Sequence, residues 1–170
     1  VVILLLAGLG SHSSFAAQGK TQSSSSLNRA MYLRVRAFLG EVRGSYILPY
    51  TSVWINFGEA TSSGQNYTDY VKNSTDIVLN SCRLHSCEER GGILLDSAGK
   101  IKAIGLVHFA CYTNRVKSHN TCLNNPRLTI FLPHSAHSGQ FVQEMREWTN
   151  AQEGHETPHE IVWLRRGGRR

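Results

Sequence analysis

Four cysteines constrain this chain more than any other residue type: Cys82, Cys87, Cys111 and Cys122. An even number of cysteines predicts two disulfides when a protein folds in an oxidising compartment. Three pairings are open, and the local one, Cys82 with Cys87 and Cys111 with Cys122, is the simplest. Zinc is the competing interpretation because His85 lies between the first two cysteines. No second close cysteine pair supplies the remaining ligands, so we favour disulfides.

The N-terminal segment predicts that the protein is exported. Residues 1–10 are almost wholly apolar, and small residues follow up to Ala16 and Ala17. This pattern is typical of the apolar region and cleavage site of a secretory signal peptide, so we expect a leader over residues 1–17 that is cut after Ala16. A buried N-terminal strand or helix is the alternative. Export would provide the oxidising environment that the disulfides require.

Length and charge predict one nearly neutral domain. The formal net charge of the 170 residues is +6, but Arg165, Arg166, Arg169 and Arg170 account for four of the 18 basic residues, which leaves 14 against 12 acidic ones. We therefore expect a single domain over residues 18–164 and a basic tail over 165–170. No stripe of basic and aromatic residues predicts nucleic-acid binding. No later apolar run reaches the ~20 residues that membrane insertion requires.

Two segments have the apolar spacing of amphipathic helices. In the first, Leu27, Met31 and Val35 recur every four residues after Ser26 or Asn28, either of which could cap the helix, and Gly40 lies near its end. In the second, the apolar residues Phe141, Met145 and Trp148 are four and then three residues apart, and we expect Ser138 to cap this helix.

Short apolar runs separated by turn residues predict an antiparallel sheet. We expect strands at 76–80, 92–96, 101–110 and 127–132, and an edge strand within 158–164. Leu94 and Leu95 would meet Ile104 and Leu106 on the covered face of the sheet. The polar stretch 58–69 predicts a loop or a weak hairpin. The expected fold class is α+β, with helices packed on a central antiparallel sheet and a protruding loop closed by a disulfide.

The segment 81–88 is the most informative part of the sequence. Two cysteines that flank Arg83, Leu84, His85 and Ser86 between two strands could close a tight ring. So short a ring stabilises a domain by only about 2 kcal/mol, so its value would be to order the loop before binding. A rigid imidazole suits insertion into a cleft lined by carboxylates, because it donates hydrogen bonds and accepts a proton. An exposed histidine in a purely structural knuckle is the alternative.

The segment Cys82-Arg-Leu-His-Ser-Cys87 resembles the signature Cys-Lys-Pro-His-Asp-Cys of the Ivy family, inhibitors of vertebrate lysozyme in bacterial periplasms. The resemblance extends to a preceding helix, Leu48-Pro49, Trp54 and Gly105-Leu106, and covers roughly residues 48–109. It implies a periplasmic protein without cofactor or metal. This protein would inhibit lysozyme-type peptidoglycan hydrolases by placing His85 in their cleft, and Arg83, Leu84 and Ser86 would contact the target.

Two departures from the family pattern concern the target. Leu84 and Ser86 replace the proline and the aspartate of the signature, which removes a hydrogen-bonding partner for the imidazole. The body of the chain is also slightly basic, whereas an inhibitor of the strongly basic vertebrate lysozymes is expected to be acidic. A bacterial lytic transglycosylase is therefore a second expected partner. Cys111 to Cys122 would form a further stapled loop, and a homodimer is a further arrangement to consider.

Three other functions compete with inhibition. An immunity protein against a cell-wall-degrading effector would share the export and the plugging loop. A small secreted enzyme is suggested by the many histidines, but the sequence lacks both a Gly-x-Ser-x-Gly elbow and a His-Glu-x-x-His motif, so we expect no catalytic activity. A eukaryotic secreted binding domain would give meaning to the glycosylation sequons at Asn66 and Asn73.

Overall fold

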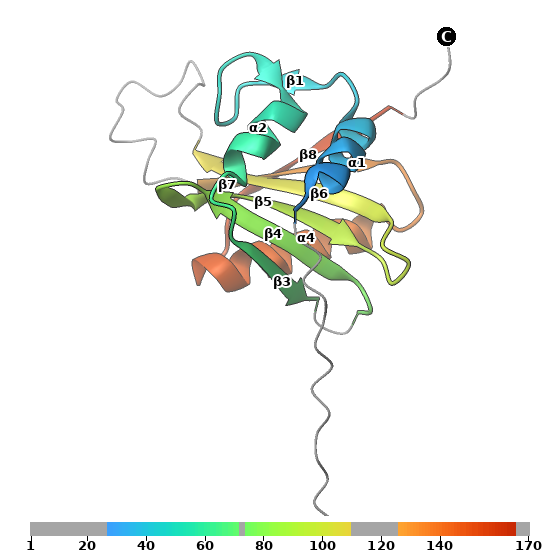
Figure 1. Cartoon of the computed structure of the whole chain (residues 1–170). Coiled ribbons are helices and arrows are strands. Elements are labelled where there is room, and N and C mark those ends of the chain that lie inside the picture. Colours follow the sequence, from blue (N-terminus) through green and yellow to red (C-terminus); the bar gives the residue numbers. More distant parts are fainter. Residues whose placement is uncertain (1–26, 72–73, 110–125, 166–170) are drawn as a thin grey trace, which may run out of the picture.

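The computed structural model describes residues 27–71, 74–109 and 126–165. The predicted leader, the segment with Cys111 and Cys122, and the end of the basic tail lie outside these residues. Within them the structure contains a six-stranded sheet, a two-stranded sheet and three helices (Figure 1). None of the described helices is long and apolar enough to cross a membrane. The α+β class expected from the sequence is confirmed.

The large sheet follows the chain order from one edge to the other. The first five strands form an antiparallel meander, and the sixth runs parallel to its neighbour after a helical crossover, so the sheet is mixed. The expectation of a purely antiparallel sheet is therefore wrong for its last strand. In order, the strands are β3 (Asn66–Tyr70), β4 (Ile77–Arg83), β5 (Ser86–Leu95), β6 (Ile101–Phe109), β7 (Pro126–Pro133) and β8 (His159–Leu164).

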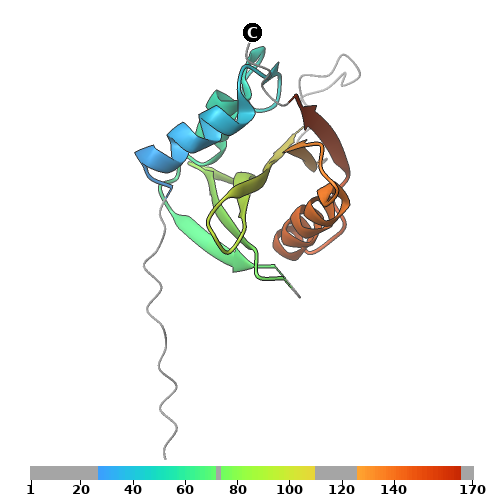
Figure 2. The same ribbon diagram turned by 90° about the vertical axis from the view of Figure 1, so that its right-hand side faces the viewer.

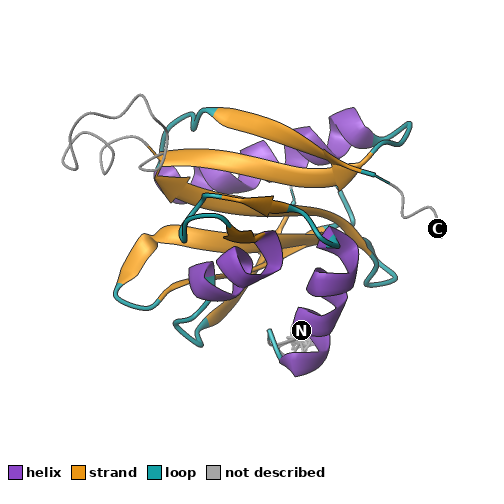
Figure 3. Ribbon diagram, turned by 90° about the horizontal axis from the view of Figure 1, so that it is seen from above, coloured by secondary structure: helices purple, strands orange, loops and turns teal. Residues whose placement is uncertain are grey.

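Helices cover both faces of this sheet. Helices α1 (Arg29–Leu39) and α2 (Val53–Ala60) lie on one face, and α4 (Ser138–Glu153) lies on the other (Figures 2 and 3). The small sheet, β1 (Arg43–Gly44) paired with β2 (Thr51–Ser52), connects α1 to α2. Helices α1 and α4 correspond to the two helices predicted from the sequence, and α2 was not predicted.

Two apolar clusters result, one on each face. The cluster under α1 and α2 contains Leu79, Leu95, Ile104 and Leu106, and the cluster under α4 contains Leu94. The expectation that Leu94 and Leu95 share a face is wrong because successive side chains of a strand point to opposite faces. Since both faces are covered, this alternation buries both residues.

The helix ends follow from their capping residues. Asn28 caps α1, because its side-chain oxygen accepts a hydrogen bond from the Met31 N–H at 3.0 Å. Gly40 ends the helix at φ 61°, a left-handed conformation that glycine adopts without strain. Ser138 is the first residue of α4 rather than its cap, and His137 takes the capping position.

Helix α4 approaches the sheet closely because two glycines face it. Gly92 on β5 pairs with Gly105 on β6, and a Cβ atom on Gly92 would lie 2.7 Å from the Trp148 ring. The indole therefore packs directly on the sheet, and its Nε1 donates a hydrogen bond to Asp69 on β3.

The polar stretch 58–69, for which the sequence predicted a loop or a weak hairpin, contains the end of α2 and most of the edge strand β3.

Candidate functional site

The ring predicted from the sequence forms at the turn between β4 and β5. A disulfide joins Cys82 to Cys87, whose Cα atoms are 4.7 Å apart. Arg83 and Ser86 form the last residue pair of the hairpin, so Leu84 and His85 are the two central residues of the turn. The pair before it is Cys82 with Arg90, so residues 87–89 of β5 form a bulge that faces no residue of β4.

His85 occupies the most strained position of this turn. Its φ of 65° lies in the left-handed region that residues with a side chain adopt at a cost of roughly 1–2 kcal/mol. The side chain is exposed, and the neighbouring Leu84 is 53% exposed. The tip of the ring therefore presents an apolar residue and an imidazole to the solvent.

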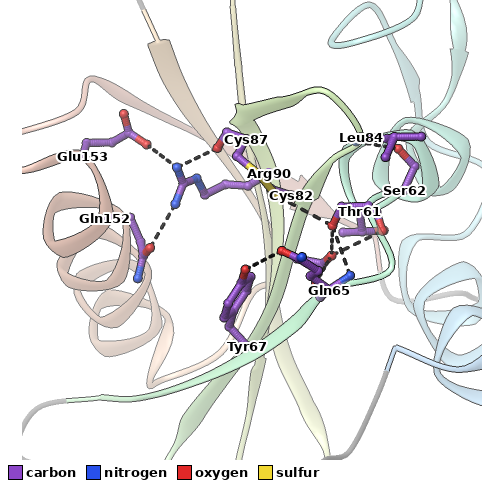
Figure 4. The surroundings of a disulfide bond; sticks show 12 residues. Thr61, Ser62, Gln65, Tyr67, Cys82, Leu84, Cys87, Arg90, Gln152 and Glu153 are labelled. Atoms are coloured by element: carbon purple, nitrogen blue, oxygen red, sulfur yellow. Dashed lines mark hydrogen bonds and ion pairs between the residues drawn. A yellow bond between two sulfur atoms is a disulfide. The ribbon is translucent and has the colours of Figure 1, made fainter.

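Helix α2 and the loop after it hold one side of the ring. Nε of Arg83 donates to Glu59 Oε1 at 3.1 Å, and another guanidinium nitrogen donates to Glu89. The Leu84 N–H donates to Ser62 Oγ at 3.0 Å (Figure 4). The hydrogen bond that Arg83 donates to Glu89 is the main reason that the pKa of Arg83 is raised. Arg83, which we expected to contact a target, makes these internal contacts and keeps 32% of its side chain exposed.

Helix α4 holds the other side of the ring. Arg90 extends from β5 and donates to the backbone oxygen of Cys87 at 2.7 Å (Figure 4). It also donates to Gln152 at 3.0 Å and lies 3.5 Å from Glu153, both near the end of α4. The ring is thus connected to both helical layers of the molecule.

Sequence reasoning missed these supporting residues. Glu59 precedes Arg83 by 24 residues, and Gln152 follows Arg90 by 62. Such pairs form only when the helices pack on the sheet, so no local spacing signals them. A sequence also does not show which charged residues pair inside the fold, so the hydrogen bonds of Arg83 to Glu59 and Glu89 were not predicted.

A groove in two parts, which share Asp69 and Gln152, lies beside the ring. One part, about 200 Å³, is lined by both cysteines, Arg90 and Gln152, and a larger part of about 530 Å³ continues along α4. Asp69 lines both parts. A single carboxylate oxygen of Asp69 accepts hydrogen bonds from Asn80 at 2.8 Å, Trp148 at 3.1 Å and Gln152 at 3.0 Å. This carboxylate therefore connects α4 to β3 and β4.

The described histidines do not converge on one site. His108 is buried, and its Nε2 lies 2.8 Å from Thr129 Oγ1, whereas His134 stacks on Trp163 at 4.0 Å between ring centroids. Within residues 27–71, 74–109 and 126–165, no three residues among histidine, cysteine, aspartate and glutamate are arranged to hold a metal ion. The ring carries one of the exposed imidazoles, that of His85, at the tip of a turn that a disulfide closes.

Comparisons with known proteins found no match, so a functional conclusion depends on the fold and the ring. No family model, no curated protein and no solved structure matches this chain. The structure defines the class: an α+β domain with a disulfide-closed hairpin turn.

Proposed function

We propose that this protein inhibits a lysozyme-type peptidoglycan hydrolase by inserting the ring 82–87 into its substrate cleft. The observation that carries the proposal is His85, which is exposed at a left-handed φ of 65° on a turn fixed from two sides. Backbone strain of this kind persists where the surrounding structure enforces it and is concentrated at functional sites. Glycine would adopt this backbone conformation without strain, so we infer that histidine is present at position 85 because its imidazole is needed.

The inhibitory step would be a contact between His85 and the catalytic carboxyl groups. Retaining glycosidases hold two carboxyl groups about 5–5.5 Å apart, and one imidazole can donate to an ionised carboxylate in such a site. Leu84 would occupy space that a sugar ring needs. Because the disulfide and the hydrogen bonds of Arg83 and Arg90 already fix the turn, docking would cost little additional conformational entropy.

The charges around the ring bear on the choice of target. Glu59 and Glu89 accept hydrogen bonds from Arg83, and Glu153 pairs with Arg90. Glu88 is exposed and pairs with no other described residue, so these four carboxylates exceed the two guanidinium groups by two negative charges. This local surface complements a basic enzyme such as a vertebrate lysozyme, although the chain as a whole is basic.

The proposal is tested by titrating the purified protein against hen-type lysozyme and a bacterial lytic transglycosylase side by side. We expect His85→Ala to weaken inhibition at least about tenfold, the effect of losing about 1.4 kcal/mol of binding free energy. Its melting temperature should stay close to that of the wild type. His159→Ala removes an exposed imidazole from β8, an edge strand of the sheet that does not take part in the ring, and this variant should inhibit like the wild type.

Two results would contradict the proposal. A His85→Ala titration that superimposes on that of the wild type would show that the ring does not plug the cleft. A wild-type protein that inhibits neither enzyme would remove both expected partners.

A further inference from the structure

Two residues other than glycine have a positive φ within the described part of the chain. One is His85, and the other is Tyr50, at φ 50° in the loop between β1 and β2. Tyr50 is 86% exposed, the largest exposure among the exposed large hydrophobic side chains of the described residues. The fold therefore supports a strained backbone at Tyr50 without using the aromatic ring in its core.

The loop that carries Tyr50 is held as firmly as the ring. Asn56 of α2 is fully buried, and its side-chain oxygen accepts hydrogen bonds from the Ile47 N–H at 2.9 Å and the Leu48 N–H at 2.8 Å. The Tyr50 N–H donates to Ser45 Oγ at 3.0 Å. A buried side chain that accepts two backbone hydrogen bonds fixes the path of a loop, so the backbone position of Tyr50 is set before any partner binds.

Helix α2 places the two strained residues on one support. Asn56 holds the loop of Tyr50, and Glu59, three residues further and about 4.5 Å along the helix axis, holds the ring through Arg83. The loop and the hairpin turn lie toward the same side of the molecule, at the left of Figure 1. The distance between them is therefore fixed by one short helix of eight residues.

One exposed apolar side chain lies on α2, the helix that supports both strained residues. Ile55 is 36% exposed and lies one turn before Glu59, on the same face of α2. Tyr50, Ile55 and Leu84 make up half of the six large hydrophobic side chains that are exposed in the described residues. We call the surface formed by Tyr50, Ile55, Leu84 and His85 the α2 ridge.

We propose that the α2 ridge is one continuous interface, in which Tyr50 contacts the outer rim of the same cleft that His85 enters. The inference rests on the proposed function and assigns the second contact of that complex. A typical interface covers about 800 Å² on each partner, a patch about 30 Å across, which exceeds the length of α2, about 12 Å. Tyrosines on rigid supports are among the residues that contribute most to such interfaces, and an apolar rim pocket would accept this ring.

The test compares variants by calorimetric binding to whichever of hen-type lysozyme and the lytic transglycosylase the wild type inhibits. Tyr50→Gly removes the aromatic ring together with the backbone strain, so the variant should fold at least as well as the wild type. We expect about tenfold weaker binding for Tyr50→Gly and for Tyr50→Ala. Leu33→Ala, which truncates a 59% exposed side chain on α1 away from the ridge, should bind like the wild type.

The outcomes separate this inference from the function on which it rests. If Tyr50→Gly binds like the wild type while His85→Ala is impaired, the second contact is refuted and the inhibitory ring stands. If Tyr50→Gly is impaired and His85→Ala is not, both proposals are overturned, because the complex would not be centred on the ring. Impaired binding by both variants, with Leu33→Ala unaffected, supports the α2 ridge.

Discussion

At the scale of the residue, His85 combines an energetic cost with an exposed functional group. A left-handed φ of 65° is unfavourable for any residue with a Cβ atom. The side chain of His85 is exposed, so it buries no surface that would offset this cost. Replacing His85 by glycine should therefore raise stability and lower inhibition. Alanine has a Cβ atom and retains the strain, whereas glycine removes it.

We predict that His85→Gly is more stable than the wild type by about 0.5–1 kcal/mol, because relief of the strain exceeds the entropy that glycine adds to the unfolded chain. His85→Ala should have the stability of the wild type, and both variants should inhibit poorly. Urea unfolding followed by circular dichroism measures the stabilities. A His85→Gly variant that unfolds at a lower urea concentration would show that the turn is not strained.

At the scale of the element, the disulfide orders the hairpin more than it stabilises the domain. The ring closes only six residues, and Cys87 is exposed whereas Cys82 is buried. From the pair of Ile77 with Leu95 to the pair of Cys82 with Arg90, β4 and β5 are paired residue by residue, and they pack under α2 and α4. Loss of the disulfide should therefore loosen the turn while the sheet remains intact.

We predict that the Cys82→Ala/Cys87→Ala double variant loses only about 2 kcal/mol of unfolding free energy. Its inhibition should fall by a much larger factor, because the freed turn must be ordered again on binding. Thermal unfolding and inhibition titrations under the same buffer conditions measure the two effects. Equal inhibition by the variant and the wild type would contradict a role for the disulfide in preparing the turn.

The sequence predicted elements whose signals are local. Periodicity located α1 and α4, Asn28 was one of the two caps expected for α1, and apolar runs located β4 to β7. Helix α2 escaped prediction because its run of valine, tryptophan, isoleucine and phenylalanine has the composition of a strand. The parallel direction of β8 was not predicted either, although a strand, a helix and a second strand in succession favour a parallel crossover. The ring was predicted, but its supports and Tyr50 depend on tertiary contacts.

At the scale of the whole molecule, a buried histidine couples the stability of the fold to pH. His108 Nε2 lies 2.8 Å from the Thr129 hydroxyl, which donates to Glu160 at 2.7 Å, and His108 Nδ1 lies 3.4 Å from the backbone oxygen of Phe109. The imidazole is also packed edge-on against Tyr46. Burial lowers the pKa of His108 below its ordinary value of 6.5.

We predict that the domain loses stability as the pH falls below 6.5, because the unfolded chain then binds a proton that buried His108 resists. The contribution of His108 is fully present above pH 6.5 and is lost as the pH falls toward its lowered pKa. The slope of unfolding free energy against pH between 7 and 5 should be smaller in His108→Gln than in the wild type. Equal slopes would exclude His108 as the source.

The attachment of the ring to both helical layers, through Arg83 to α2 and through Arg90 to α4, has a kinetic consequence. A turn that already has its final shape needs no slow rearrangement after first contact. Association would then proceed as a single bimolecular step, with an observed rate that increases in proportion to partner concentration. The lifetime of the complex, rather than the speed of its formation, would then distinguish one target enzyme from another.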